Sequence, residues 1–535
     1  MMKCNWFDYP YESKRNCVIA RNGVVATSNP LAAQAGLEIL HKGGNAVDAA
    51  VATAICLTVV EPTSNGIGGD NFAIVSKGDQ LYGLNSSGYS PKNLSIEKLK
   101  EKGIQEMPRF GWEAVTVPGA PAGWAKCCDQ FGNLTLEECA QPAIKYALEG
   151  FVLQPTVCEN WMKAAEFYKK VFLEEKFNHW FNTFTKDGKP PQVGEIIRLN
   201  DHAQTLKRIG ESNACDFYSG ALMHQIIAFS DQTGGYFSAE DFTGYQASIV
   251  EPISAGYRGY EIWEIPPNGQ GIIALEALSI LERTDCLSRE ARYFHHEIEA
   301  LKLAFEDGKE YITQPEYMPF DYHLLLNRDY ISKRAQLIGN EAMIPEASNP
   351  SQSGTVYLAT ADKEGMMCSF IQSNYMGFGS GLVVPGTGIS LQNRGHSFSL
   401  DETHSNVLQP HKRPYHTIIP GFITKNSKPV GPFGVMGGFM QPQGHLQVIS
   451  NMIDFQMNPQ SALDAPRWQW TGEKNILIEK DFTSSIAHEL DRMGHKITVS
   501  MNSNLFGRGQ IILRNEAGVY VAGTEKRTDG HIAVW

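Results

Sequence analysis

Two hydroxyl side chains in the C-terminal part of the chain have a spacing that could bring them together for chemistry. Thr355 begins the run TVYLATAD and Ser373 ends the run MMCSFIQS, and both runs are typical of β-strands. The Lys-Glu-Gly sequence at 363–365 fits a three-residue hairpin loop with its glycine in the left-handed conformation. In that register Asp362 pairs with Met366. Thr355 then faces Ser373, with Cβ atoms about 4.5–5.5 Å apart.

A threonine hydroxyl can serve as a nucleophile, but it is weak at neutral pH and needs a base. Threonine is common in strands, where most examples are structural. The hairpin alone therefore predicts two adjacent hydroxyls, and the rest of the chain must show whether they are catalytic.

The composition favours an acidic protein with a large core. The 535 residues are 42% hydrophobic and carry a formal net charge of -12, which allows one large body or two domains and shows no basic stripe for nucleic acid. The N-terminal MMKCNWFDYPYESKRN has no apolar segment of about 7–15 residues, so no secretory signal is expected. The longest apolar stretch, 46–60, contains Asp48 and is shorter than the roughly 18–20 residues of a membrane span. We expect a buried helix there and a cytoplasmic protein.

The sequence shows no motif for a metal or a cofactor. Its ten cysteines form no CxxC and no Cys/His cluster, which favours reduced structural thiols. The sequence PPNGQG at 266–271 lacks the Lys-Ser/Thr ending of a phosphate-binding loop. We therefore expect no metal site and no cofactor.

The N-terminal third is expected to place helices after a first strand. The strand is predicted at 23–28, and a helix follows at Pro30 with Ser28 or Asn29 as its cap and Gly43-Gly44 at its end. The buried helix comes next. The glycine-rich run NGIGGDNFAIV then indicates a turn with positive φ, or close packing, before another strand.

The C-terminal third is richer in strands. Short β-rich runs lie at 355–362, 366–373, 417–424 and 509–515, and helices are expected after Gly444 and around 484–493. Strand runs mixed with helical runs on one long chain indicate a layered α+β or α/β architecture. The absence of a repeat or an obvious linker in the sequence favours one intertwined body.

Residues 23–75 closely resemble the N-terminal signature of the γ-glutamyltransferase family, and GGNAVDAAVA is the most specific part of the match. Further matches follow in the family's order: VPGAPAGW, FYSGALMHQI, GGYFSAEDFTGY, YRGYEIWEIPPNGQG, GTVYLATADKEG, FGSGLVVPGTGISLQN, KRPYHTIIP, VMGGFMQPQG and NPQSALDAPRW. The resemblance covers nearly the whole chain. It implies an α+β fold, the four-layer αββα sandwich of N-terminal-nucleophile hydrolases.

The resemblance also implies a precursor that cleaves itself between Gly354 and Thr355. The large-subunit segment 1–354 and the small-subunit segment 355–535 would then stay associated as one intertwined domain. The new N-terminal threonine would be the nucleophile. Cleavage frees its α-amino group, whose pKa of about 7.7–8.0 suits a general base near neutral pH. The implied reaction transfers an acyl group from a small amide to water or to a second amine.

Other positions match the family's site residue by residue. Ser373 matches the hydroxyl that orients the nucleophile. Gly437 and Gly438 match the oxyanion hole, where backbone N–H groups point at the developing negative charge. His416 and Thr417 match two substrate-binding serines, and of these Thr417 keeps the hydroxyl.

Three departures from the family change the expected substrate pocket. The family's arginine for the substrate carboxylate is missing from LNSSGYSP, where Ser87 and Gly88 are the nearest matches. The aspartate for the substrate amino group is replaced by Ser397. A glutamine of the same stretch is replaced by Arg394. This arginine could bind a carboxylate bidentately, or it could be a structural residue that bonds loop carbonyls.

Two more differences concern the surroundings of the pocket. The family has an asparagine at the position of Tyr375, and here Asn374 lies next to that position. Only 13 residues, 399–411, lie where many members have a long lid. A short lid is expected to leave the pocket open to water and to favour hydrolysis over transfer.

These departures leave three functions open. The leading one is a γ-glutamyl amide hydrolase or transferase that acts on glutathione-like compounds. The second is a glutaryl or cephalosporin-type acylase with the same nucleophile. The third is an uncleaved, non-catalytic homologue, against which Thr355, Ser373 and the 437–438 glycine pair argue. The expected partner is a small-molecule amide, with no nucleic acid and no membrane, and a higher oligomer stays open.

Overall fold

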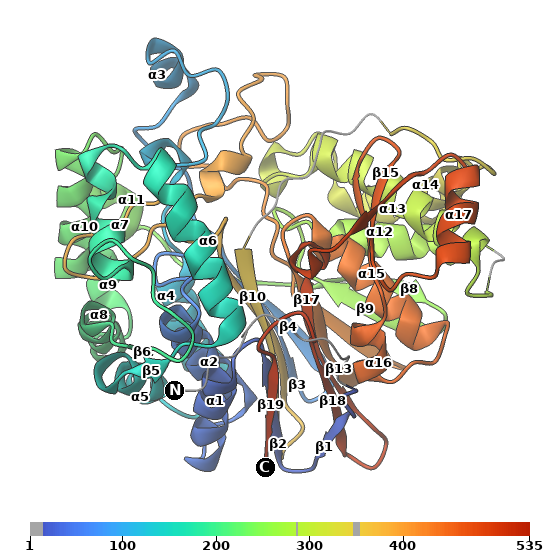
Figure 1. Cartoon of the computed structure of the whole chain (residues 1–535), viewed down its shortest axis with the longest axis horizontal. Coiled ribbons are helices and arrows are strands. Elements are labelled where there is room, and N and C mark those ends of the chain that lie inside the picture. Colours follow the sequence, from blue (N-terminus) through green and yellow to red (C-terminus); the bar gives the residue numbers. More distant parts are fainter. Residues whose placement is uncertain (1–13, 285–286, 346–353) are drawn as a thin grey trace.

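Two seven-stranded sheets lie face to face in the middle of the molecule (Figure 1). The structure is a computed structural model that describes residues 14–284, 287–345 and 354–535. The first sheet has the order β19 (His531–Val534), β2 (Gly23–Thr27), β10 (Gly354–Asp362), β11 (Met367–Tyr375), β3 (Asp70–Lys77), β4 (Gln80–Ser86) and β7 (Ser248–Val250). The second has the order β1 (Val18–Ala20), β18 (Tyr520–Thr524), β17 (Arg508–Arg514), β13 (Lys428–Met436), β12 (Gly421–Lys425), β9 (Tyr260–Glu264) and β8 (Ile253–Tyr257).

Helices cover the outer face of each sheet (Figure 1). On the first sheet, α1 (Pro30–His41), α2 (Ala46–Val60) and α4 (Ala120–Phe131) contact the strands, and α5 (Leu136–Glu149) and α8 (Asn200–Glu211) lie outside them. On the second sheet, α12 (Gly271–Leu281), α15 (Met440–Ile453) and α16 (Pro459–Asp464) contact the strands, and α13 (Ala291–Tyr311) and α17 (Ser484–Arg492) lie outside. These four layers confirm the expected α+β sandwich of αββα type.

Smaller elements surround this sandwich. The helices are α3 (Ile96–Glu101), α6 (Pro155–Val171), α7 (Asn178–Phe184), α9 (Cys215–Ser219), α10 (Ala221–Gln232), α11 (Ala239–Thr243) and α14 (Arg328–Ala335). The 3₁₀ helices are η1 (Trp112–Ala114), η2 (Glu175–Phe177), η3 (Pro315–Tyr317), η4 (Tyr322–Leu326), η5 (Arg394–Ser397) and η6 (Ser503–Phe506). The strands β5 (Phe151–Val152) and β6 (Ile196–Ile197) form one small sheet, and β14 (Trp468–Gly472), β15 (Asn475–Glu479) and β16 (Lys496–Ser500) form another.

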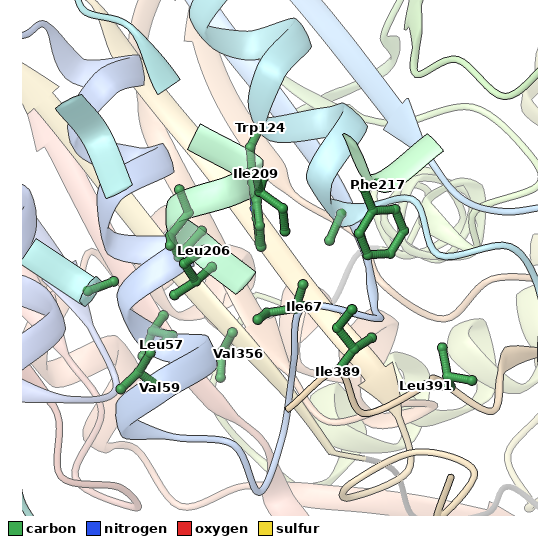
Figure 2. Packing of buried hydrophobic residues seen from close by; sticks show 14 of the residues in the cluster. Leu57, Val59, Ile67, Trp124, Leu206, Ile209, Phe217, Val356, Ile389 and Leu391 are labelled. Atoms are coloured by element: carbon green, nitrogen blue, oxygen red, sulfur yellow. The ribbon is translucent and has the colours of Figure 1, made fainter. Parts of the chain in front are cut away.

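Side-chain alternation along β10 assigns the two faces of the first sheet. Val356 packs with Leu57 and other helical residues in the core that Figure 2 shows. Tyr357 points the other way and packs with Phe422 of the second sheet. Because strand side chains alternate, Thr355 points into the space between the two sheets.

The two N-terminal helices begin where the sequence predicts. Asn29 rather than Ser28 caps α1, since its side chain accepts a hydrogen bond from Leu31 N. Asn45 and Asp48 form a reciprocal capping box at the start of α2. Every residue of α2 is buried, as expected for the longest apolar stretch.

Glycines allow two close approaches near the site. The helix expected after Gly444 begins earlier, at Met440, so the glycine lies inside α15. A Cβ at Gly444 would lie 2.6 Å from Val435 Cγ1 of β13, so the helix packs directly on the strand there. In the glycine-rich run, a Cβ at Gly68 would lie 2.4 Å from Ser390 O. Close packing therefore explains that glycine.

The strand expected at 417–424 is shorter than predicted. β12 begins at Gly421, because the N–H groups of Ile418 and Ile419 donate to the side chains of His416 and Gln441 instead of to a strand. His416 N donates to Asn268 O at 2.8 Å, and Gln270 N donates to His416 O at 3.0 Å. The 416–420 segment is thereby held as a loop beside β10 and β11 rather than as part of the strand.

No helix of the described ranges has the length and apolar character to cross a membrane. The eight cysteines in these ranges are unpaired, in agreement with the expected thiols. Cys4 and Cys286 lie outside the described residues, as do residues 1–13 of the N-terminal segment.

Candidate active site

The β10–β11 hairpin brings Thr355 and Ser373 together in the predicted register. Ala361 pairs with Met367, and Gly365 in the loop has a φ of 93°. The hydroxyl oxygens of Thr355 and Ser373 are 3.1 Å apart, and both side chains are fully buried. The predicted pairing of the two hydroxyls is confirmed.

Ser373 links the Thr355 hydroxyl to the peptide bond that precedes it. Its Oγ donates to Gly354 O at 2.8 Å and accepts from Tyr375 N at 2.8 Å. A serine hydroxyl has one proton, so the Thr355 hydroxyl is the donor in the contact between the two side chains. The arrangement places both the attacking oxygen and the carbonyl of the expected cleavage site against one serine.

Arg394 adds a buried positive charge beside this pair. Its Nη1 donates to Thr417 Oγ1 at 2.7 Å, and its Nη2 lies 3.5 Å from Ser373 Oγ. The guanidinium carbon is 4.1 Å from the ring centre of Tyr375. Burial lowers the pKa of Arg394 to about 10, so the side chain stays protonated at neutral pH.

The contacts of Arg394 decide between the two roles left open for it. Within the described ranges its side chain donates to the two hydroxyls and to no loop carbonyl, and its Nε has no partner. No carboxylate of these ranges forms an ion pair with it. The interpretation as a structural arginine that bonds loop carbonyls is therefore wrong. Asp70 acts on Arg394 only through its charge, without a direct contact. A buried cation without a direct ion pair is costly, so the site is suited to an anionic group of a ligand.

Asp70 and His416 form a buried pair next to these residues. Asp70 Oδ1 accepts from Gly119 N at 3.0 Å, and Asp70 Oδ2 lies 3.1 Å from His416 Nε2. Ile418 N donates to His416 Nδ1 at 3.3 Å, so the ring proton is on Nε2 and points at Asp70. Burial and then Arg394 hold the pKa of His416 well below its usual value, so the ring is neutral.

Both ring nitrogens of His416 are thus engaged within the protein. The expectation that His416 contacts substrate is not supported by these bonds, because its polar atoms serve Asp70 and the backbone. Thr417 instead presents its hydroxyl to Arg394 and lies next to the nucleophile hairpin.

Gln270 connects Thr417 to the glycine pair. Its Nε2 donates to Thr417 O at 2.6 Å and to Gly438 O at 2.8 Å. Its Oε1 accepts from Tyr415 Oη at 2.7 Å. One amide side chain therefore fixes the distance between the loop before β12 and the start of α15.

Gly437 and Gly438 join β13 to α15 with φ values of 136° and 61°, a region that favours glycine. In the described part of the chain, neither backbone N–H donates to a protein acceptor. The helix α15 begins at Met440, with Phe439 as its N-cap between the glycine pair and the helix. Free N–H groups before a helix start provide positive potential, which is compatible with the oxyanion hole that the family resemblance implies.

Asn374 does not join the hydroxyl pair. Strand alternation turns it to the opposite face from Ser373, where a Cβ at Gly66 would lie 2.8 Å from its Nδ2. Tyr375 reaches the site instead, with a φ of 75° and its ring on Arg394. Of the two neighbouring candidates, Tyr375 lies at the site and Asn374 does not.

Ser397 is also turned away from a ligand role. Its hydroxyl lies 2.7 Å from Arg394 O and 2.8 Å from Tyr415 O, and its single proton is donated to one or the other of these carbonyls. The residue therefore ties η5 to the loop before His416. It offers no charge to a substrate ammonium.

Ser87 and Gly88 occupy a tightly packed turn. The Ser87 hydroxyl donates to Asn85 Oδ1 at 2.7 Å, and a Cβ at Gly88 would lie 1.6 Å from Val117 O. Neither residue replaces the family's arginine. Arg413, from a distant segment, lies near Tyr89, the residue after Gly88. Its guanidinium carbon is 4.5 Å from the centre of the Tyr89 ring.

Sequence reasoning missed Asp70, Gln270 and Arg413. The one local signal for Asp70 is its position between two glycines and a buried strand. For Gln270 the one local signal is its place in the PPNGQG sequence. Arg413 lies in KRPYHTIIP and is 9% exposed, and its Nε and Nη2 have no partner among the described residues. Their roles depend on partners far away in the sequence, which a single sequence does not reveal.

Among the residues that the structure describes, the expected open pocket is not observed. Thr355, Arg394 and Thr417 are each 0% exposed. The short 399–411 segment folds onto the site's supporting loop, since Asn406 Nδ2 donates to Ser397 O at 2.6 Å and Asn406 Oδ1 accepts from the backbone N–H of residue 415 at 2.9 Å. A short segment therefore covers the loop closely instead of exposing it.

Two clusters elsewhere have the residue types of a metal site. One joins Asp48, Cys128 and Cys139, and the other joins His295, Glu299 and His495. In the second, His295 Nδ1 and His495 Nε2 are 2.9 Å apart and the Lys302 ammonium is 2.7 Å from Glu299. In the first, Asp48 accepts hydrogen bonds at the α2 cap. Internal hydrogen bonds and an ion pair account for these clusters.

Comparison with known proteins extends these observations. The family model for gamma-glutamyltranspeptidase matches residues 32–535. The glutathione hydrolase-like YwrD proenzyme of Bacillus subtilis is 37% identical over 96% of this chain and 98% of its own length. The acylase ACY 1 proenzyme of a Pseudomonas species (strain SE83) is 30% identical over 95% of this chain and 92% of its own. The crystal structure of cephalosporin acylase from Bacillus halodurans superposes with a TM-score of 0.97 at 54% identity, covering 100% and 99% of the two chains.

The layered fold, with a threonine at the start of a central strand, defines an N-terminal-nucleophile hydrolase. The chain belongs to the γ-glutamyltranspeptidase family. It is therefore an enzyme of the hydrolase and acyl-transferase type, related to proenzymes.

Proposed function

We propose that this chain is a self-processing amide hydrolase for small substrates whose acyl group carries a carboxylate at its far end, such as glutaryl amides. Arg394 is the observation that carries this proposal. It is fully buried, protonated, without an ion-pair partner in the described ranges, and in contact with the nucleophile's own serine. A carboxylate at the far end of the acyl group would neutralise it.

In the processing step, Thr355 Oγ attacks the Gly354 carbonyl carbon. The C–N bond breaks, the threonine nitrogen takes a proton, and the acyl group moves to the hydroxyl as an ester. Water then cleaves the ester and leaves segments 1–354 and 355–535. Ser373 supports this step, because its hydroxyl accepts a hydrogen bond from the Thr355 hydroxyl and donates one to the Gly354 carbonyl.

In the mature enzyme, the free α-amino group of Thr355 serves as the base. The hydroxyl attacks the substrate amide, and the amine leaves with the proton. The N–H groups of Gly437 and Gly438 stabilise the oxyanion. Water then hydrolyses the acyl-enzyme. The site's full burial favours electrostatic stabilisation of this kind.

A γ-glutamyl acyl group is the second candidate. It differs from glutaryl by an α-ammonium, and Ser397 supplies no charge for that group. Asp70 is the observation that favours it, since this buried carboxylate lies one strand from Ser373. The relative named glutathione hydrolase-like supports it, and the solved relative named cephalosporin acylase supports the first candidate.

Hydrolysis of glutaryl-p-nitroanilide and γ-glutamyl-p-nitroanilide separates the candidates. We expect kcat/KM for the glutaryl substrate to be the higher of the two. In Arg394→Gln it should fall about 10–100-fold, the effect of one charged hydrogen-bonded contact. Butyryl-p-nitroanilide, which lacks the carboxylate, should be hydrolysed equally by both proteins. A preference for the γ-glutamyl substrate, or equal losses on the butyryl and glutaryl substrates, would contradict the proposal.

A further inference from the structure

Asp70 lies in line with the two hydroxyls across three strands. It begins β3 and pairs with Ser373 of β11, which faces Thr355 of β10. Side chains of directly paired residues point to the same side of a sheet, with Cβ atoms about 4.5–5.5 Å apart. Asp70 therefore faces the same space between the sheets as the reacting groups.

The carboxylate is held in place but its charge is not cancelled by a contact. Gly119 N and His416 Nε2 each donate to one of its oxygens, and His416 is neutral. The side chain of Asp70 is 0% exposed. Water therefore does little to screen its charge from groups in the same space.

Other ionisable groups face Asp70 from the elements around it. Arg394 of η5 and Arg413 of the following loop both lower its pKa, and neither makes an ion pair with it. Tyr218 and Tyr245 also lie near, and burial raises the pKa of both hydroxyls, so they are uncharged at neutral pH. When it is ionised, Asp70 thus contributes a negative charge beside the two cations.

The proposed reaction changes the charge at the hydroxyl pair, which Arg394 contacts and which faces the same space as Asp70. In the substrate the reacting carbon is a neutral amide. In the last step water attacks the acyl-enzyme, the bond to Thr355 Oγ breaks, the threonine regains its proton, and the released acid loses one. The product then has a second carboxylate where the amide was. That group lies at the hydroxyl pair, one strand from Asp70.

We infer that Asp70 is a specificity-determining residue that favours the neutral amide over the charged acid and so promotes product release. This inference rests on the proposed function. Asp70 acts through its charge, while Arg394 holds the far carboxylate that substrate and product share. Like charges in a buried site repel more strongly than in water.

The ionisation of Asp70 gives the inference a pH dependence. Burial raises its pKa to about 7, against the lowering effect of Arg394. Above this pH Asp70 is charged and repels the product, and below it the repulsion disappears. Product affinity should therefore fall as the pH rises through neutrality.

Two ligands of matched shape test this by calorimetry on the mature enzyme. Glutarate resembles the product, and glutaramate resembles the substrate amide and lacks one charge. At pH 8 we expect Asp70→Asn to lower the Kd of glutarate about fivefold and to leave that of glutaramate within about twofold. At pH 5.5 the variant and the wild type should bind glutarate equally. The α-amino group titrates in both proteins, so the difference between them reports Asp70.

Equal effects on the two ligands, or no effect at pH 8, would overturn the inference, because a structural role changes both alike. Intact mass and Tm show whether Asp70→Asn matures and folds. If it does not, His416→Gln keeps the charge and alters its hydrogen bond. The pH midpoint of glutarate binding must then shift, and an unchanged midpoint overturns the inference. Failure of both ligands to bind the wild type would instead refute the proposed function, and the inference with it.

Discussion

At the scale of single residues, the site is a row of three hydroxyl side chains with one cation, Arg394, between the second and the third. Thr355 contacts Ser373, Ser373 contacts Arg394, and Arg394 contacts Thr417. Most buried polar atoms in proteins have partners, yet Arg394 Nε has none in the described ranges. The contact of Arg394 with Ser373 places its charge beside the hydroxyl pair.

Ser373→Ala tests the central hydroxyl of this row. The change removes the acceptor for the Thr355 hydroxyl and the donor to Gly354 O, so the rate of self-cleavage should fall about 10²-fold. Ser369→Ala is the matched control. Ser369 lies on the same face of β11 and bonds the Tyr357 hydroxyl at 2.8 Å, away from the cleavage site. Gel electrophoresis over time after expression would follow both. Equal processing of the two variants would remove Ser373 from the mechanism.

At the scale of elements, the hairpin needs the second sheet to approach closely. Gly434 of β13 lies under the ring of Tyr357, and a Cβ there would be 2.4 Å from the ring's Cε2. The absence of a side chain at this point lets β13 and its glycine pair reach β10. The site's geometry thus depends on a sheet-to-sheet distance.

Gly434→Ala should therefore destabilise the protein by about 1–3 kcal/mol, the usual cost of overpacking. It should also slow maturation, since it displaces β13 from the nucleophile. Gly256→Ala in β8 of the same sheet is the control, because a Cβ there meets nothing within 4 Å. Thermal melting and the fraction of cleaved protein would be measured for both. A Gly434→Ala protein as stable as Gly256→Ala would show that the sheets can separate without cost.

The elements that the sequence predicts well are those fixed by nearby residues. The hairpin register follows from the loop at 363–365, and the α2 cap follows from Asn45 and Asp48. The start of β12 was misplaced because Ile419 N donates to the side chain of Gln441, which lies in α15, instead of to a strand. Asp70 and Gln270 were missed for the same reason. Their partners lie far along the chain, so no local pattern records the contact.

At the scale of the whole molecule, the segments before and after Thr355 are interleaved. The first sheet combines β2, β3, β4 and β7 from before this residue with β10, β11 and β19 from it onward. The second combines β1, β8 and β9 with β12, β13, β17 and β18. A cut before Thr355 would leave both products hydrogen-bonded within the same two sheets, so they should stay together.

The most direct test of the account is the intact mass of the purified wild type and of Thr355→Ala. We expect the wild type to consist of fragments 1–354 and 355–535, which co-elute in size-exclusion chromatography. Thr355→Ala should remain a single uncut chain with the same fold. A wild type that stays uncut under conditions that permit maturation would lack the α-amino base. That result would contradict the proposed mechanism and favour a non-catalytic homologue.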